Sequence, residues 1–288
     1  MDIATSKRGL LGLKAFFGLL LVCLYAPLVL LVIFSFNDSN IPAFPLRGFT
    51  THGYEQFWAN TELRAALATS AKVGLIASLG SVALSVVSSI ALVRRNFFAK
   101  SAVSAFLLSP LVIPLAVFAI ALLILFSQLG IDTGMWTLVA GHIVITLPYT
   151  ILVIVPRLQR IDVRLEEAAR DLGAGALRTF RSITLPLITP AVVSAFLVAF
   201  VFSFDEIVLA SFVAGNTVTF PLYLYSQLRF PTLLPQVIAV AVVVMVASAV
   251  IVLLAEVGRR VVERRLDAEL AESAADIGVP IRAQPAEG

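Results

Sequence analysis

The sequence predicts an all-α polytopic membrane protein with six transmembrane helices. Hydrophobic residues make up 59% of the 288 residues and charged residues only 14%, whereas soluble domains are roughly 25% charged. The mean hydropathy is correspondingly high, at +0.98. Apolar stretches long enough to cross about 30 Å of hydrocarbon as helices recur along the chain. Helix is the open-ended structure that satisfies its own backbone polar groups in lipid.

The six expected spans define the domain organisation. They are residues 15–36, 66–93, 102–126, 135–155, 186–213 and 235–262. Together they form a transmembrane domain over residues 15–265, preceded by a cytoplasmic segment, residues 1–14. The tail, residues 266–288, is acidic and Ala-rich before it reaches its prolines. We expect it to begin as a short helical extension and to end in disorder.

The basic residues predict the orientation. Most of the 21 Lys and Arg residues fall before the first span, between the second and third, between the fourth and fifth, or after the sixth. Since cytoplasmic loops carry an excess of Lys and Arg, both termini are expected in the cytoplasm. The net charge of +3 therefore reflects membrane orientation, and no nucleic-acid partner is expected.

The cytoplasmic loop 161–186 has the pattern of two short amphipathic helices. Asp162 is a plausible N-cap, and Leu165, Ala168 and Leu172 recur at helical spacing on one side. Gly173 and Gly175 are expected to end the first helix. A second short segment then leads to a proline that opens the fifth span.

The charges of this loop argue against a position on lipid headgroups. Glu166, Glu167 and Asp171 would face a surface that is usually anionic on the cytoplasmic side. Insertion into the groove of a partner protein fits better, because Ala168 and Ala169 allow close approach.

The loop also resembles the signature loop of bacterial ATP-binding-cassette (ABC) importer permeases. Its order is Glu167-Ala168-Ala169, then Gly173, Ile183 and Leu185-Pro186, with the family spacing. The resemblance implies that the loop docks into a cleft on a separate ATPase and passes the closure of that ATPase to the membrane helices. The docking residues would be Glu166, Glu167, Ala168, Ala169, Arg170, Asp171, Leu172, Gly173, Ile183, Leu185 and Pro186.

Over roughly residues 15–265 the chain resembles the second permease of spermidine/putrescine importers, with a MetI-like core. Short motifs in family order include Ser109-Pro110, Leu147-Pro148 and Ser203-Phe204-Asp205-Glu206. The resemblance implies a bacterial inner-membrane location and a small cationic substrate such as a polyamine. The implied partners are a second homologous permease, two copies of an ABC ATPase and a periplasmic solute-binding protein.

The substrate remains open at this point. The acidic pair is Asp-Glu here, where Asp-Asp is also common in the family. The alternatives are an ABC permease for another small solute, such as an amino compound or an opine-like molecule, and a self-sufficient secondary transporter. The secondary transporter is disfavoured because the chain is short and shows no clear internal repeat.

Asp205 and Glu206 are the adjacent acids within a predicted span. Carboxylates at membrane depth normally face a bundle interior, a water-filled path or a partner charge. A carboxylate pair suits a diamine or triamine, so both are candidates for the substrate path. The alternative is a structural ion pair with Lys72, which otherwise is expected to snorkel towards the membrane surface.

Three other side chains have competing interpretations. Tyr223 and Tyr225 could offer aromatic faces to an ammonium group in the substrate path, although such residues more often form the aromatic belt at the membrane surface. His142 lies in an apolar stretch without acidic neighbours in sequence. We expect it to be a hydrogen-bonded core histidine, with a proton relay or a ligand as the alternative role.

No catalytic motif is evident. The sequence lacks the Gly-rich phosphate-binding loop followed by Lys and Ser or Thr, so ATP hydrolysis is not expected of this chain. The single cysteine, Cys23, excludes an internal disulfide. We expect no cofactor or metal on this chain, and no enzyme activity. ATP and Mg²⁺ would bind to the partner ATPase.

Overall fold

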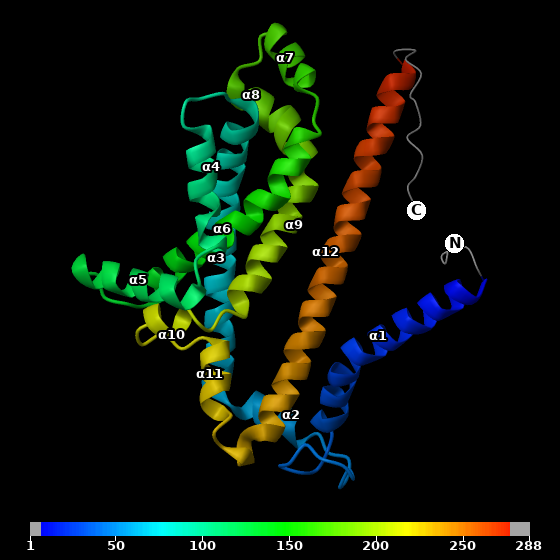
Figure 1. Ribbon diagram of the computed structural model, residues 1–288, viewed down its shortest axis with the longest axis vertical. Helices are drawn as coiled ribbons and strands as arrows, with labels where there is room; N and C mark the ends of the chain where they lie inside the picture. Colours follow the sequence, from blue (N-terminus) through cyan, green and yellow to red (C-terminus); the bar gives the residue numbers. More distant parts are fainter. Residues whose placement is uncertain (1–6, 277–288) are drawn as a thin grey trace. The chain divides into compact units, whose positions relative to one another are not determined.

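The computed structural model describes residues 7–276 and divides the chain into two compact units (Figure 1). The first unit comprises residues up to Ala65 together with Tyr223–Ala247. The second comprises Ala66–Leu222 together with the chain from Ser248 onward. Helices dominate both units, and the described residues contain an isolated antiparallel bridge between Asn37 and Phe49.

Five helical segments are long and apolar enough to cross a membrane. They are Leu10–Ser35 in α1 (Lys7–Ser35), α3 (Thr61–Arg94), α6 (Met135–Gln159), Ala176–Phe204, and Leu234–Gly258 in α12 (Leu234–Asp276). Each overlaps one of the predicted spans, which confirms the polytopic helical class. The helical extension predicted at the start of the tail is also present, since α12 continues to Asp276. The predicted disordered end falls largely on residues 277–288, outside the described residues.

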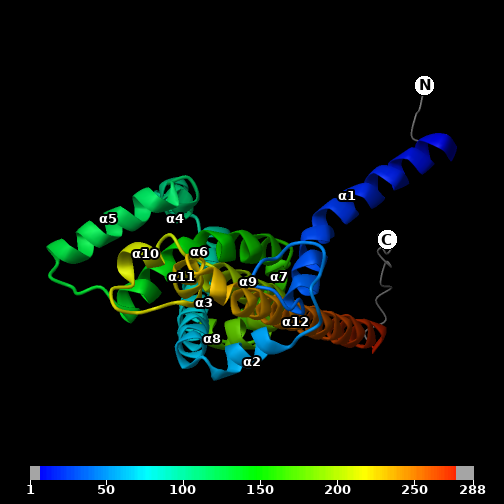
Figure 2. The same ribbon diagram turned by 90° about the horizontal axis from the view of Figure 1, so that it is seen from below.

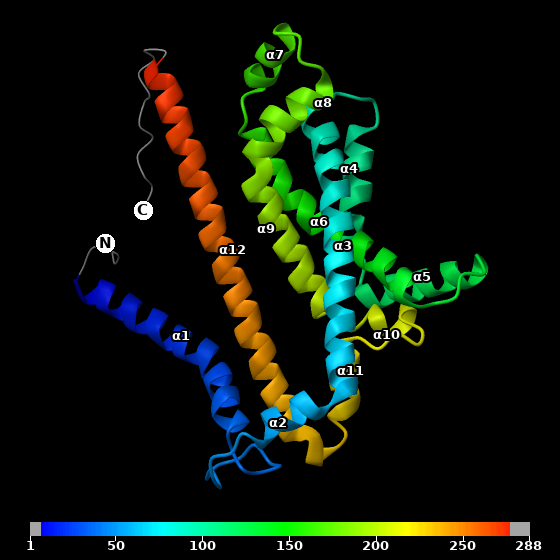
Figure 3. The same ribbon diagram turned by 180° about the vertical axis from the view of Figure 1, so that it is seen from behind.

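The predicted third span is not one straight helix. It consists of α4 (Lys100–Leu108), the 3₁₀ turn η2 (Ser109–Leu111) and α5 (Leu115–Gln128), with a bend of 104° between its two parts (Figures 1 and 3). Prolines explain the break. Pro110 is the second residue of the 3₁₀ turn and Pro114 is the N-cap of α5. Each lacks a backbone N–H and restricts the residue before it. If the bent pair is one span, the chain has six.

The first unit is built around the loop that follows α1. The Ser35 hydroxyl is hydrogen-bonded to the Tyr54 hydroxyl of α2 (His52–Ala59) at 2.7 Å. The Phe36 and Phe49 rings stack with their centroids 5.2 Å apart. These contacts hold the loop against α2. The same unit contains most of α11 (Phe220–Gln227) and the 3₁₀ turn η4 (Pro231–Leu233).

In the second unit α6 packs along α9 (Leu185–Phe204). The face of α3 that is turned into the unit carries buried serines at helical spacing, namely Ser78, Ser81, Ser85 and Ser89. Small residues allow membrane helices to approach closely, and the Ser81 hydroxyl is hydrogen-bonded to Thr150 of α6 at 3.1 Å. The short helix α10 (Ala210–Val213) packs against α5 and α6 (Figure 2).

The predicted fifth span is displaced. The chain is helical from α8 (Ala176–Thr179) through the π-helical turn Phe180–Thr184 into α9, and it leaves the helix at Phe204 rather than at residue 213. The π turn ends at Thr184, two residues before Pro186, whose missing N–H interrupts the regular hydrogen-bond ladder. The second short segment of the 161–186 loop is therefore continuous with the span that follows it.

The turn after α10 leads to a prediction about stability. Gly215 has φ +56°, and a Cβ atom there would lie 2.2 Å from the carbonyl oxygen of Thr133. Gly130 has φ +66° but open space around its Cβ position. A left-handed backbone conformation costs a residue other than glycine about 1–2 kcal/mol of stability. Gly130→Ala should carry this cost alone, whereas Gly215→Ala carries it together with a clash against the Thr133 backbone.

We therefore expect Gly215→Ala to lower the melting temperature of the detergent-solubilised protein clearly more than Gly130→Ala. Thermal unfolding followed by intrinsic fluorescence measures both variants. Equal melting temperatures would show that residues 133 and 215 are not in close contact.

Candidate functional site

The helix of the 161–186 loop, α7 (Val163–Asp171), is defined by its two ends. At its start the Asp162 carboxylate accepts a hydrogen bond from the backbone N–H of Arg164 at 2.9 Å, as predicted for an N-cap. At its end Gly173 has φ +83°. The N–H of Ala174 donates to the carbonyl of Ala169, and that of Gly173 donates to Arg170, which is a Schellman closure requiring a left-handed residue at 173.

The apolar side of α7 has no cover within the second unit. Leu165 is 47% exposed and Leu172 is 89% exposed, with Ala168 exposed between them. Glu167 is also exposed. In Figures 1 and 3, α7 lies at one end of this unit, beyond α8. Glu167 and Ala168 of the motif thus belong to one exposed helical surface with Leu165 and Leu172.

The remaining predicted docking residues lie around this surface. Arg170, Asp171 and Gly173 are exposed, and Ala169 is half-buried. Ile183 belongs to the π-helical turn, while Leu185 and Pro186 are half-buried at the beginning of α9. The two parts of the motif are therefore brought together by the turn at Gly173, with α9 attached directly to the second part.

Glu166 differs from the other docking candidates because it is only 4% exposed. Its Oε1 lies 3.2 Å from Nε of Arg94, the last residue of α3, and accepts a hydrogen bond from the Thr184 hydroxyl at 3.1 Å. Its Oε2 lies 3.5 Å from the Arg170 guanidinium. Arg94 also donates to the carbonyl of Ile161 at 3.1 Å. The periodicity of the loop did not predict this inward orientation.

The acidic pair lies at the opposite end of α9. Asp205 is the C-cap of α9, and residues 205–209 are non-helical before α10 begins. The pair is therefore located at a helix break and not inside a continuous span as predicted. A helix of the length of α9, 20 residues, separates this break from the docking loop by about 30 Å.

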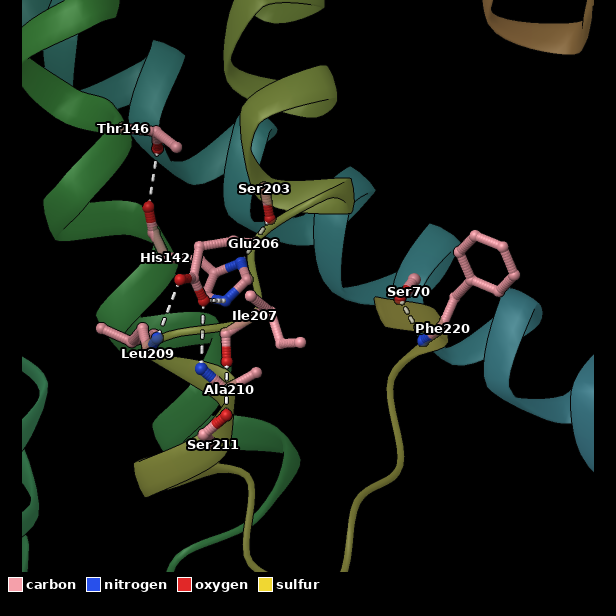
Figure 4. A network of polar contacts seen from close by, with 10 residues as sticks. All are labelled: Ser70, His142, Thr146, Ser203, Glu206, Ile207, Leu209, Ala210, Ser211 and Phe220. Carbon is pink, nitrogen blue, oxygen red and sulfur yellow. Dashed lines mark hydrogen bonds and ion pairs between the residues drawn. The ribbon is translucent and has the colours of Figure 1, made fainter. Parts of the chain in front are cut away.

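The two acids have different surroundings, and Figure 4 shows those of Glu206. Glu206 is 6% exposed, and its two carboxylate oxygens accept hydrogen bonds from the backbone N–H groups of Leu209 and Ala210, at 2.8 and 3.0 Å. Asp205 is exposed. Glu206 thus closes the turn into α10, whereas the Asp205 carboxylate remains accessible.

His142 connects this turn to α6. It is buried, its Nδ1 is hydrogen-bonded to the Ser203 hydroxyl at 2.5 Å, and its Nε2 lies 3.6 Å from Glu206 Oε2, beyond hydrogen-bond length (Figure 4). The prediction of a hydrogen-bonded core histidine is confirmed. The contact with Glu206, which is distant in sequence, could not be read from the chain. Among the described residues, the side-chain partner of Glu206 is thus His142 and not Lys72.

Tyr223 and Tyr225 belong to the first unit. Tyr223 is 8% exposed, and its hydroxyl accepts a hydrogen bond from Asn60 Nδ2 at 2.9 Å. Tyr225 is 62% exposed. The phenol of Tyr223 is therefore engaged within its own unit, and of the two rings Tyr225 is the accessible one.

The contrast between the two acids gives a prediction. Glu206→Ala removes hydrogen bonds to two backbone N–H groups and should destabilise the protein by about 2–4 kcal/mol. Asp205→Ala is the matched control, because an exposed site usually costs less than about 0.5 kcal/mol. Thermal unfolding in detergent should show a clear loss for the Glu206 variant only. A comparable loss in both variants would contradict the capping role.

Comparison with known proteins identifies the family of this chain. A family profile described as "Binding-protein-dependent transport system inner membrane component" matches residues 81–268. The "Spermidine/putrescine transport system permease protein PotC" of Escherichia coli strain K12 is 36% identical over 231 residues, covering 80% of this chain and 87% of that protein. The "Putrescine transport system permease protein PotI" of the same strain is 35% identical, covering 79% and 83%.

Solved structures agree on the fold. A bacterial ABC transporter involved in the import of the acidic polysaccharide alginate superposes with a TM-score of 0.70 at 14% identity, covering 89% of this chain and 99% of that one. The matched family profile, the permease relatives and the helical fold all lead to the same assignment. The chain belongs to the family of inner-membrane permease components of binding-protein-dependent transport systems.

Proposed function

We propose that this chain is the permease subunit of a polyamine importer driven by a separate ATPase. Together with a second, homologous permease it forms the path for a diamine or triamine such as putrescine or spermidine. Two copies of an ABC ATPase bind ATP and Mg²⁺, and a periplasmic binding protein delivers the substrate. The substrate assignment draws on relatives at 35–36% identity whose names specify spermidine and putrescine.

The observation that carries the proposal is the exposed surface of α7. Leu165 and Leu172 are exposed apolar side chains beside the exposed carboxylate of Glu167. An amphipathic helix with an uncovered apolar side is the element that a groove on a partner protein accepts. Because the loop continues without a break from α8 into α9, displacement of the loop by a closing ATPase would move a membrane helix directly.

The arginines around the loop 161–186 support a particular orientation of the chain in the membrane. Arg157, Arg160, Arg164, Arg178 and Arg181 flank or lie within the docking loop. This density of arginine supports a cytoplasmic position for the loop. If the bent pair of α4 and α5 is one span, the number of spans is even. Both termini would then be cytoplasmic, and the break at Asp205 would face the outer half of the membrane.

Asp205 is the proposed internal contact for the substrate. It is exposed at the end of α9, whereas both oxygens of Glu206 are occupied by backbone N–H groups. A single accessible carboxylate at membrane depth suits an ammonium group passing along the path. We therefore assign the substrate contact to Asp205, and assign Glu206 to holding the turn.

The docking surface is tested with Glu167→Gln and Gly173→Ala in the purified transporter. We expect each to lower uptake per ATP hydrolysed by about tenfold, through loss of a docking contact or through strain at a left-handed position. Glu62→Gln, at an exposed glutamate in the first turn of α3, should leave this ratio unchanged. Normal coupling in both loop variants would refute the docking surface.

The substrate path is tested with Asp205→Asn. Uptake of labelled putrescine or spermidine should fall, with a raised apparent KM, because the charge opposite the ammonium group is lost. Competition by unlabelled polyamines, and its absence with amino acids and opine-like compounds, should define the substrate class. Wild-type uptake by the variant would exclude Asp205 as a contact. Stronger competition by another solute would exclude the polyamine assignment.

A further inference from the structure

The buried carboxylate of Glu166 lies where three elements of the second unit meet. Its oxygens contact the Arg94 guanidinium of α3 at 3.2 Å and the Thr184 hydroxyl of the π-helical turn at 3.1 Å. Glu166 itself belongs to α7. One side chain of the docking helix is therefore tied at once to the end of one membrane helix and to the beginning of another.

These contacts are shielded from water. The side chain of Glu166 is 6% exposed and that of Arg94 14% exposed. Screening by solvent weakens exposed ion pairs greatly, whereas a buried pair retains its strength and is costly to break on one side only. Arg94 also binds the carbonyl of Ile161, directly before α7, so it holds this helix at two points.

The same geometry removes Glu166 from the surface offered to a partner. Glu167 and Leu172 are exposed, whereas Glu166 faces the opposite way, into the unit. A residue in this position cannot contact an ATPase while its present contacts last. It can, however, carry the displacement of α7 into the helices bound to it.

We propose that Glu166 is a positioning residue that transmits movement of the docking helix to α3 and α9, with Arg94 as its partner. The inference rests on the proposed function, since it assigns a second step to the same loop. In this proposal the closing ATPase pushes on Glu167 and its neighbours on the exposed side of α7. Glu166 and Arg94 pass the displacement of α7 on, so that α3 moves together with α9.

The experiment is a double-mutant cycle in the complete transporter, with Arg94→Gln, Glu166→Gln and the double variant. Arg94→Gln leaves Glu166 with the more exposed Arg170 as its charged partner but unties it from α3, and Glu166→Gln leaves Arg94 without its carboxylate. Each single variant should therefore lower uptake per ATP hydrolysed by about tenfold, while the ATPase still copurifies. The double variant leaves no uncompensated charge in the pair, so its loss should be no greater than that of the worse single variant. Arg95→Gln, at an exposed neighbouring arginine, is the matched control and should match wild type.

The outcomes separate this inference from the proposed function. Wild-type coupling in both single variants, or losses that multiply in the double variant, would overturn the transmitting role while leaving the docking surface intact. Failure of the ATPase to copurify even with the wild-type chain would instead refute the proposed function. If a Gln variant does not fold, Arg94→Lys and Glu166→Asp keep the charges but shorten the side chains, so that the contact between residues 94 and 166 is lengthened or lost. Normal coupling in those two variants would equally overturn the inference.

Discussion

Removing a carboxylate from water is costly unless hydrogen bonds and opposite charges replace the water, and this constraint organises both ends of α9. At one end the Glu206 carboxylate accepts hydrogen bonds from two backbone N–H groups, and the imidazole of His142 lies 3.6 Å away. At the other end Glu166 is compensated by Arg94, Arg170 and Thr184. Each buried acid ties α9, or the turn next to it, to another helix.

The two ends differ in what remains accessible. Asp205, the residue before Glu206, is exposed. Glu167, the residue after Glu166, is exposed as well. In both places a buried acid fixes the backbone and its sequence neighbour points outward. This arrangement separates the residues that hold the structure from the exposed residues that we propose meet a substrate or a partner. A helix of about 30 Å lies between the two ends, and under the proposed function it would be the mechanical link between the ATPase side and the substrate path.

The break at residues 205–209 also explains how an acidic pair exists at membrane depth. A non-helical segment exposes backbone donors and acceptors, which is tolerated in a membrane only where protein or a water-filled path satisfies them. Here the Glu206 carboxylate accepts from two of these donors, and the Ile207 carbonyl accepts from the Ser211 hydroxyl (Figure 4). The segment is therefore a defined turn, with its own polar partners.

The sequence by itself determined the helical membrane class, five of the spans, and the first helix of the loop 161–186 with its cap at Asp162 and stop at Gly173. These features depend on local composition, periodicity and residue chemistry. Pro110 and Pro114 break the helix after α4, but the tertiary structure decided the 104° angle of the bend, the helix end at Phe204, and the inward orientation of Glu166. Glu166 could not be placed from periodicity because its partner Arg94 is distant in sequence, and the same holds for Glu206 and His142. A charged residue is buried or exposed according to the partner that folding brings to it, and hydropathy along the chain does not contain that information.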